Sequence, residues 1–276
     1  MLGRTPLVCA AALLAAALLA TPRAMADAPA PADPWPMLAQ DIFKGQPIQD
    51  GSGLIAIEMP YRAEDAAIVP VTLRMTLPPS DTRQVKAVTL VIDQNPAPMA
   101  ARFELGRDAA VTEISTRVRV NFYTDVHAVA ELSDGHLYMV KTYVKASGGC
   151  SAPAAKNAEE AKNNLGQIRF RQFAPTEDGP TNGSRSAQVM IGHPNNSGLQ
   201  MDQVTQLYVP PFFVNDLRIL QDDAPLLSMQ GGISISENPN IRFSYVPNGA
   251  KTIRVEAKDT DGHLFQGEWK LDASAM

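Results

Sequence analysis

Val69-Pro70-Val71-Thr72-Leu73-Arg74-Met75 is the stretch from which the fold can be read. Its larger apolar side chains fall at every second position, which is the spacing of a strand with one buried face. The same kind of segment recurs between turn residues at 54–57, 88–92, 114–120, 126–131 and 137–144, and later at 167–173, 187–191, 212–220, 241–246, 252–257 and 264–271. Many short strands without a long amphipathic helix predict an all-β sandwich fold.

Two of these segments give more specific predictions. Ser133-Asp134-Gly135 separates the strands at 126–131 and 137–144, and its residues favour a hairpin turn. In the 114–120 segment, the alternation places Ile114, Thr116, Val118 and Val120 inward and Ser115, Arg117 and Arg119 outward.

The second half of the chain repeats the first at a fixed offset. Asp134-Gly135-His136-Leu137 returns 127 positions later as Asp261-Gly262-His263-Leu264, and Ala97-Pro98 matches Ala224-Pro225 at the same offset. We therefore expect two related sandwich domains in tandem. The first covers residues 38–152 and the second 167–276, with the polar, alanine-rich segment 153–166 as their linker.

Residues 1–26 have the features of a secretory signal peptide. Arg4 precedes an apolar run from Leu7 to Ala20, and Ala24 and Ala26 provide small residues for cleavage. No segment predicts a membrane span, so we expect an exported, periplasmic protein that begins with a Pro/Ala-rich, extended leader at 27–37. Because Arg4 and Arg23 leave with the signal peptide, the formal charge changes from −5 to −7. An acidic chain without a basic run argues against nucleic-acid binding.

The familiar signatures of catalysis are missing from the sequence. It contains no Cys-x-x-Cys pair, no glycine loop for phosphate and no His-Glu-x-x-His helix. The histidines, His127, His136, His193 and His263, are interpreted as strand and turn residues. We expect no metal, no cofactor and no catalytic residue, and the chain is not expected to be an enzyme by itself.

Cys150 is the one chemical group that stands out. The other cysteine, Cys9, lies in the predicted signal peptide, so the mature chain has no partner for an internal disulfide. Gly148 and Gly149 precede Cys150 and predict a flexible arm with an exposed thiol of nearly ordinary pKa. Such an arm suits a carrier that other enzymes act on. An incidental free thiol and an intermolecular disulfide remain alternative interpretations.

The sequence resembles a known carrier family. The first domain resembles SoxY, the cysteine-bearing subunit of the SoxYZ carrier of periplasmic thiosulfate oxidation. This resemblance rests on Val69-Pro70-Val71-Thr72, Asn95-Pro96-Ala97-Pro98, 115–120, 128–135 and Gly148-Gly149-Cys150. The second domain resembles SoxZ through the segments His193-Pro194-Asn195-Asn196-Ser197-Gly198, Ile235-Ser236-Glu237-Asn238-Pro239 and Asp259-Thr260-Asp261-Gly262. The fused arrangement resembles the SoxYZ-like carriers associated with quinoprotein (PQQ) alcohol dehydrogenases.

The resemblance implies immunoglobulin-like sandwiches that pack together, and a sulfur intermediate held on Cys150 as a thioconjugate. It implies a c-type cytochrome that loads the thiol and a hydrolase that processes the conjugate. One departure from SoxY is that its arm ends the chain as Gly-Gly-Cys-Gly-Gly, whereas Ser151-Ala152-Pro153 follows Cys150 here. The arm is therefore tethered at both ends, and its cargo is left open.

Two other functions remain from the sequence. One is a non-covalent adaptor or binding module for a periplasmic quinoprotein dehydrogenase, for which Cys150 would be dispensable. The other is an independent thiol enzyme, such as a peroxidase or sulfurtransferase, which would need a base beside Cys150.

Overall fold

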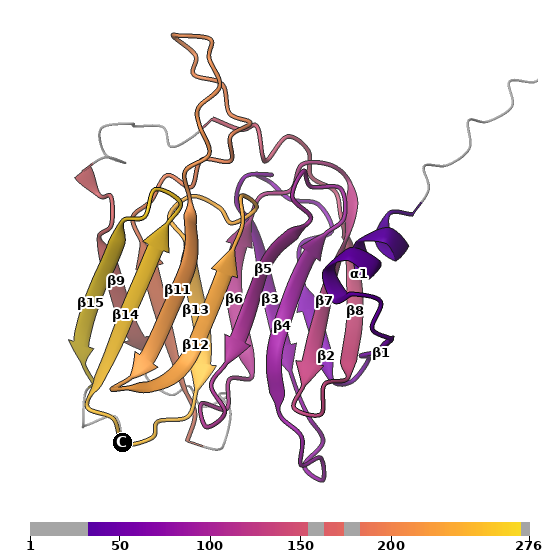
Figure 1. Cartoon of the computed structure of the whole chain (residues 1–276), viewed down its shortest axis with the longest axis vertical. Helices are drawn as coiled ribbons and strands as arrows, with labels where there is room; N and C mark the ends of the chain where they lie inside the picture. The colour runs from indigo at the N-terminus through magenta and orange to yellow at the C-terminus, as the bar shows by residue number, and fades with distance from the viewer. Residues whose placement is uncertain (1–32, 154–162, 174–182, 272–276) are drawn as a thin grey trace, which may run out of the picture. The chain divides into compact units, whose positions relative to one another are not determined.

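The computed structural model describes residues 33–153, 163–173 and 183–271. The predicted signal peptide, most of the predicted leader and most of the predicted linker lie outside the described residues. Within the described residues the chain forms one helix and fifteen strands (Figure 1). The prediction of a mainly β protein is therefore confirmed.

The strands form two sheets. The larger sheet has the order β1 (Ile48–Asp50), β8 (Leu137–Val144), β7 (Thr124–Leu132), β4 (Val85–Ile92), β5 (Met99–Leu105), β12 (Ala224–Gly231), β11 (Val214–Gln221), β14 (Thr252–Asp259) and β15 (Leu264–Lys270). The smaller sheet has the order β2 (Ile55–Glu58), β3 (Val69–Met75), β6 (Glu113–Val118), β13 (Asn240–Tyr245), β10 (Arg185–Ile191) and β9 (Ile168–Phe173). Neighbouring strands are antiparallel except β1 and β8, which are parallel.

The two halves of the chain join edge to edge in both sheets. In the larger sheet, β5 pairs with β12, with Phe103 opposite Met229. In the smaller sheet, β6 pairs with β13, with Ile114 opposite Phe243. At the offset of 127 residues, β6 falls on β13 and β5 overlaps β12, so each joint is made by two equivalent strands. Figure 1 shows these strands side by side in the middle of the sheets.

The space between the sheets holds one hydrophobic core. A single cluster of buried side chains runs from Val71 and Leu90 in the first half, through Phe103 at the joint, to Val189 and Val255 in the second half. Two separate sandwich domains would each have a core of their own. The structure instead has one core that both halves share, because the paired edge strands bring their buried faces together.

Helix α1 (Trp35–Phe43) covers part of the outer face of the larger sheet (Figure 1). Phe43 packs with Val129 of β7 and Leu137 of β8 in a second, smaller cluster. Helix α1 includes Trp35, Pro36 and Met37, which the sequence interpretation placed in an extended leader. That part of the prediction is wrong, because the apolar side chains of the helix cover the sheet.

Candidate functional site: the Cys150 arm

The segment that carries Cys150 follows β8 and lies against the folded protein. The backbone N–H of Gly148 donates to Asn121 O at 2.9 Å, and the N–H of Gly149 donates to Val120 O at 3.0 Å. The N–H of Ser151 then donates back to Gly148 O at 3.2 Å, closing a tight turn. We refer to residues 146–151 as the arm. The sequence predicted an arm free of the sandwich, and the structure contradicts that prediction.

Gly149 is required because there is no room for a side chain at this position, and not because the backbone needs to be flexible. A Cβ on Gly149 would lie 2.0 Å from Ala66 O and 2.6 Å from Val120 O, which is far inside van der Waals contact. Gly148 has φ +78°, a backbone conformation that glycine adopts without strain. The pair of glycines thus lets the arm approach two backbone segments so closely that no side chain fits between them.

The thiol of Cys150 is buried, with no exposed surface. Burial raises the pKa of Cys150 from 9.0 to about 11, and the nearby Arg119 guanidinium opposes part of that rise. The sequence predicted an exposed thiol with nearly ordinary pKa, so this prediction is wrong for the docked arm. The reason is that hydrogen bonds to the arm backbone hold the cysteine beneath the surface.

The second half of the chain also holds the arm. The hydroxyl of Ser197, in the segment between β10 and β11, donates to the carbonyl oxygen of Cys150. Ser197 lies in the His193–Gly198 motif, and its own hydroxyl also accepts a hydrogen bond from Leu199 N at 3.2 Å. The site that receives the arm is therefore built by both halves. We call it the seat, defined by Ala66, Arg119, Val120, Asn121 and Ser197.

Arg119 is the charged residue of the seat. Its side chain is almost wholly buried, with Nη1 donating to Gly149 O at 3.1 Å and Nη2 to Asn195 O at 3.4 Å. Its Nε has no hydrogen-bond partner among the described residues. Burial lowers the pKa of Arg119 from its usual value. The sequence pattern placed Arg119 on the outside, and that prediction is wrong because β6 ends at Val118 and the alternation ends with it.

A buried amide ties the seat to the joint between the halves. Asn95 Nδ2 donates to Arg119 O at 2.7 Å and to Ser234 Oγ at 2.8 Å, while Asn95 Oδ1 accepts from Asn121 N at 2.9 Å. These bonds fix the backbone that Arg119 and Asn121 present to the arm. Asn95 belongs to the Asn95-Pro96-Ala97-Pro98 motif, but no periodicity or spacing could have predicted its role here.

The histidines fill structural positions away from the thiol. His127 Nδ1 lies 2.9 Å from Asp93 Oδ1 inside the sheet face, and its ring stacks on Trp35 at 3.7 Å. His136 and His263 each lie beside a turn carboxylate, Asp134 and Asp259 respectively. The described residues contain no group of three or more His, Cys, Asp and Glu side chains arranged to hold a metal ion.

His193 is the histidine that lies nearest the seat. It is buried, its Nδ1 accepts from Asn195 N at 3.1 Å, and its Nε2 lies 3.6 Å from Asp259 Oδ2. Burial lowers the pKa of His193, which favours the neutral ring. Its Nδ1 is occupied by the hydrogen bond that shapes the Asn195 loop, so it orders this loop instead of offering a free base to Cys150.

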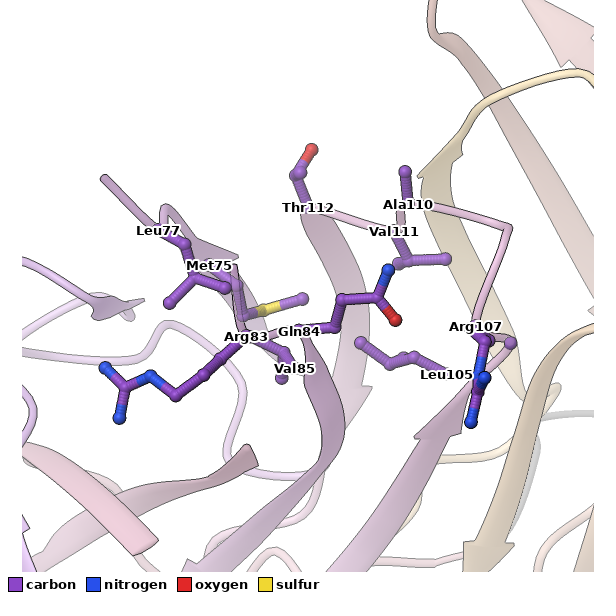
Figure 2. A pocket seen from close by; sticks show the side chains of 11 residues that line it. Met75, Leu77, Arg83, Gln84, Val85, Leu105, Arg107, Ala110, Val111 and Thr112 are labelled. Carbon is purple, nitrogen blue, oxygen red and sulfur yellow. The ribbon is translucent and has the colours of Figure 1, made fainter. Parts of the chain in front are cut away.

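Two clefts lie elsewhere on the described surface. One of about 240 Å³ is lined by Met75, Arg83, Leu105, Thr112 and neighbours, and Figure 2 shows their side chains around it. Another of about 330 Å³ is lined by Arg117, Arg169, Asn238 and neighbours. Neither lining includes a residue of the arm. The thiol, which has no exposed surface, belongs to neither of these two clefts.

Comparison with known families decides what this arrangement belongs to. Residues 39–150 match the family described as "Sulfur oxidation protein SoxY", and residues 176–270 match "Sulphur oxidation protein SoxZ". The chain is a SoxY domain fused to a SoxZ domain. The SoxY match ends on Cys150 itself, at the tip of the arm. Ser197 and Asn195, which face the arm from the other half, lie within the SoxZ match.

Other comparisons add little. No curated protein matches the chain. Solved structures of superoxide reductase (neelaredoxin) from Ignicoccus hospitalis are similar over parts of it. One covers 33% of this chain and 79% of its own at 13% identity and TM-score 0.30, and a variant of the same reductase covers 38% and 96% at 11% identity and TM-score 0.32. Likeness at this level carries no argument about function.

The two families define the general role of the chain. SoxY and SoxZ proteins are non-catalytic carriers in sulfur oxidation, so a SoxY–SoxZ fusion is a carrier that works with enzymes of a Sox system. Sox systems generally operate in the periplasm. Among the described residues, no helix is long and apolar enough to cross a membrane.

Proposed function

We propose that this SoxY–SoxZ fusion carries a sulfur-containing intermediate covalently on Cys150, as a thioconjugate that partner enzymes form and process. The observation that carries the proposal is the position of Cys150. It is the free cysteine of the described residues, it ends the SoxY match, and it lies on an arm held by backbone hydrogen bonds to the first half and by the Ser197 hydroxyl of the second half. A segment held in this way can leave its seat without unfolding the sandwich.

Loading requires the arm to leave the seat. With a pKa of about 11, only about one docked thiol in ten thousand is a thiolate at pH 7, and the sulfur has no exposed surface. With thiosulfate as cargo, Cys–SH and S₂O₃²⁻ form Cys–S–S–SO₃⁻ with release of one proton and two electrons. The electrons pass to a c-type cytochrome, and a hydrolase then cleaves the terminal S–S bond with water, releasing sulfate and leaving a persulfide.

The proposal includes export. A signal peptide over residues 1–26 would place the mature chain in the periplasm, where the c-type cytochrome of such a system works. One measurement tests export and loading together. Protein is purified from a periplasmic extract without reductant, and its intact mass is recorded before and after treatment with dithiothreitol.

The expected mass corresponds to residues 27–276 plus sulfur-containing adducts that disappear on reduction. Cys150→Ser is the matched control, since it removes only the thiol, and its spectrum should show no adduct. Unmodified protein in cells actively oxidising thiosulfate, with a thiol that stays closed to alkylating reagents, would refute covalent carriage.

A second function, a non-covalent adaptor for a quinoprotein (PQQ) dehydrogenase, is favoured by a different observation. The segment between β10 and β11 extends beyond the sheets (Figure 1) and exposes Val204, Leu207 and Tyr208, with 91% of Val204 accessible. A docking role would leave Cys150→Ser fully active in supporting the dehydrogenase. Under the carrier proposal that variant fails, so the same substitution separates the two functions.

A further inference from the structure

The charge of Arg119 is not matched by the residues around it. The side chain is almost wholly buried, yet no carboxylate of the described residues lies within ion-pair distance of it. Glu237 and Asp65 act on it only from a longer range. Its hydrogen bonds to Gly149 O and Asn195 O go to neutral carbonyl oxygens, and its Nε has no partner among the described residues. A buried charge without a counter-charge is costly, so such a group is unusual where only packing is needed.

The unmatched charge acts electrostatically on the Cys150 thiol, which would carry the cargo. Nη1 of Arg119 contacts the carbonyl of Gly149, the residue that precedes Cys150. The arm would bring any group on the Cys150 sulfur into this neighbourhood. The thiol itself is neutral at neutral pH and leaves the guanidinium uncompensated. A negatively charged sulfur group would supply the missing counter-charge.

Resting on the proposed carrier function, we propose that Arg119 is the counter-charge for an anionic group on Cys150. The seat then retains anionic sulfur conjugates, such as a thiosulfonate or a persulfide, in preference to neutral disulfides. Arg119 acts here as a positioning residue that determines the class of cargo. It contacts the conjugate and takes no part in forming or breaking its bonds.

The steric situation strengthens the discrimination. The docked thiol has no exposed surface, so an added group on the sulfur has no direct path to solvent. A conjugate must therefore displace part of the seat, and the hydroxyl contact from Ser197 to Cys150 is a single bond that can open. A neutral conjugate gains nothing from this displacement. An anionic conjugate gains attraction to Arg119, which is strong because the site excludes water.

Two reagents give conjugates of similar length and different charge. Tetrathionate reacts with the Cys150 thiolate to give Cys–S–S–SO₃⁻ and thiosulfate. Methyl methanethiosulfonate reacts with the same thiolate to give the neutral Cys–S–S–CH₃ and methanesulfinate. Both reactions are displacements at sulfur that need no external oxidant.

The experiment compares hydrogen exchange of the Gly148 and Gly149 amides in the full mature chain. Both amides are hydrogen-bonded when the arm is docked, to Asn121 O and Val120 O. In the wild-type protein, we expect the thiosulfonate form to exchange at least about threefold more slowly than the methyl disulfide form. In Arg119→Gln this difference should vanish, and Arg119→Lys should retain part of it.

Arg117→Gln is the matched control. Arg117 is two residues away, donates to Asn238 O at 3.0 Å and lines the cleft outside the seat, so its loss should leave the difference intact. Equal exchange of the two wild-type conjugates overturns the proposal, even if Arg119→Gln fails to fold. A difference that persists in folded Arg119→Gln also overturns it. Because both conjugates are made chemically, the result does not depend on finding a natural cargo.

Discussion

The absence of a side chain at Gly149 allows the arm to dock and to bury the Cys150 thiol. Replacing Gly149 with alanine places a methyl group 2.0 Å from Ala66 O, a clash with rigid backbone that the docked arm cannot relieve. The Gly149→Ala arm should stay out of its seat and expose Cys150. The pKa of the thiol should then fall from about 11 toward its usual 9.0, which raises the thiolate fraction at neutral pH up to about a hundredfold.

The pH dependence of iodoacetamide alkylation measures this change. In the wild-type protein the rate should keep rising up to about pH 11, whereas in Gly149→Ala it should level near pH 9. Docking raises the pKa of the Cys150 thiol, which is an acid. The free energy that favours the docked arm is therefore constant below pH 9 and decreases as the pH rises from 9 toward 11. Gly135→Ala is the control, since Gly135 also has positive φ but lies in a distant turn with open space around it. Identical profiles for wild type and Gly149→Ala would contradict docking.

At the scale of elements, the ring contact between Trp35 and His127 and a small apolar cluster help to hold helix α1 on the larger sheet. Trp35 stacks on His127 of β7 at an interplanar angle of 11°. A 2.9 Å hydrogen bond between His127 Nδ1 and Asp93 Oδ1 holds the His127 ring in this position. Because Trp35 is only half-buried, Trp35→Ala should lower the free energy of unfolding by about 1–3 kcal/mol.

Urea denaturation followed by circular dichroism measures this loss. Met37→Ala is the matched control on the same helix, because Met37 is 66% exposed and its truncation should change the midpoint little. If both variants unfold at the same urea concentration as the wild type, the packing of Trp35 on the larger sheet does not contribute to the free energy of unfolding, which contradicts the prediction.

At the scale of the whole molecule, the shared core predicts one unfolding transition for two domains. Both sheets continue through the joint, and one cluster of buried side chains spans it. The two tryptophans report on opposite ends, since Trp35 precedes the SoxY sheet strands and Trp269 lies in β15. In Trp35→Phe and Trp269→Phe, the remaining tryptophan should give the same urea midpoint as circular dichroism of the same variant. Separate transitions would show that each domain folds on its own core.

Much of this architecture could be predicted from the residues. The bounds of β3 and β8 agree with the predicted segments. The clean alternation of β3 marks a strand with one buried face, and the Ser133-Asp134-Gly135 turn fixes the start of β8. Strands β5 and β12 were missed. They contain consecutive buried residues, such as Ala100 and Ala101, and both pack in the middle of a sheet, where period two is lost.

The sequence predicted which residue forms the candidate site, but it did not predict that this residue is buried. Cys150 was predicted because the other cysteine, Cys9, lies in the predicted signal peptide and because two glycines precede Cys150. Its burial depends on Ser197, Arg119 and Asn95, which lie 24 to 139 residues from their contacts and come together only through the joint. No local pattern encodes such contacts. The pair Gly148 and Gly149 is compatible both with a flexible hinge and with a close approach of two backbone segments, and the sequence alone does not distinguish these two arrangements.

The pairing of equivalent strands at both joints has an evolutionary consequence. When a sandwich pairs with its own duplicate, each copy covers an edge strand of the other copy. A substitution in such an edge strand therefore affects the pairing of both copies, and selection acts on the two strands together. Selection on the ends of the strands acts on each copy separately. Val246 occupies the position equivalent to Arg119 at the offset of 127 residues. The chain thus pairs equivalent strands at both joints, while its first half presents the thiol and its second half holds the arm through Ser197.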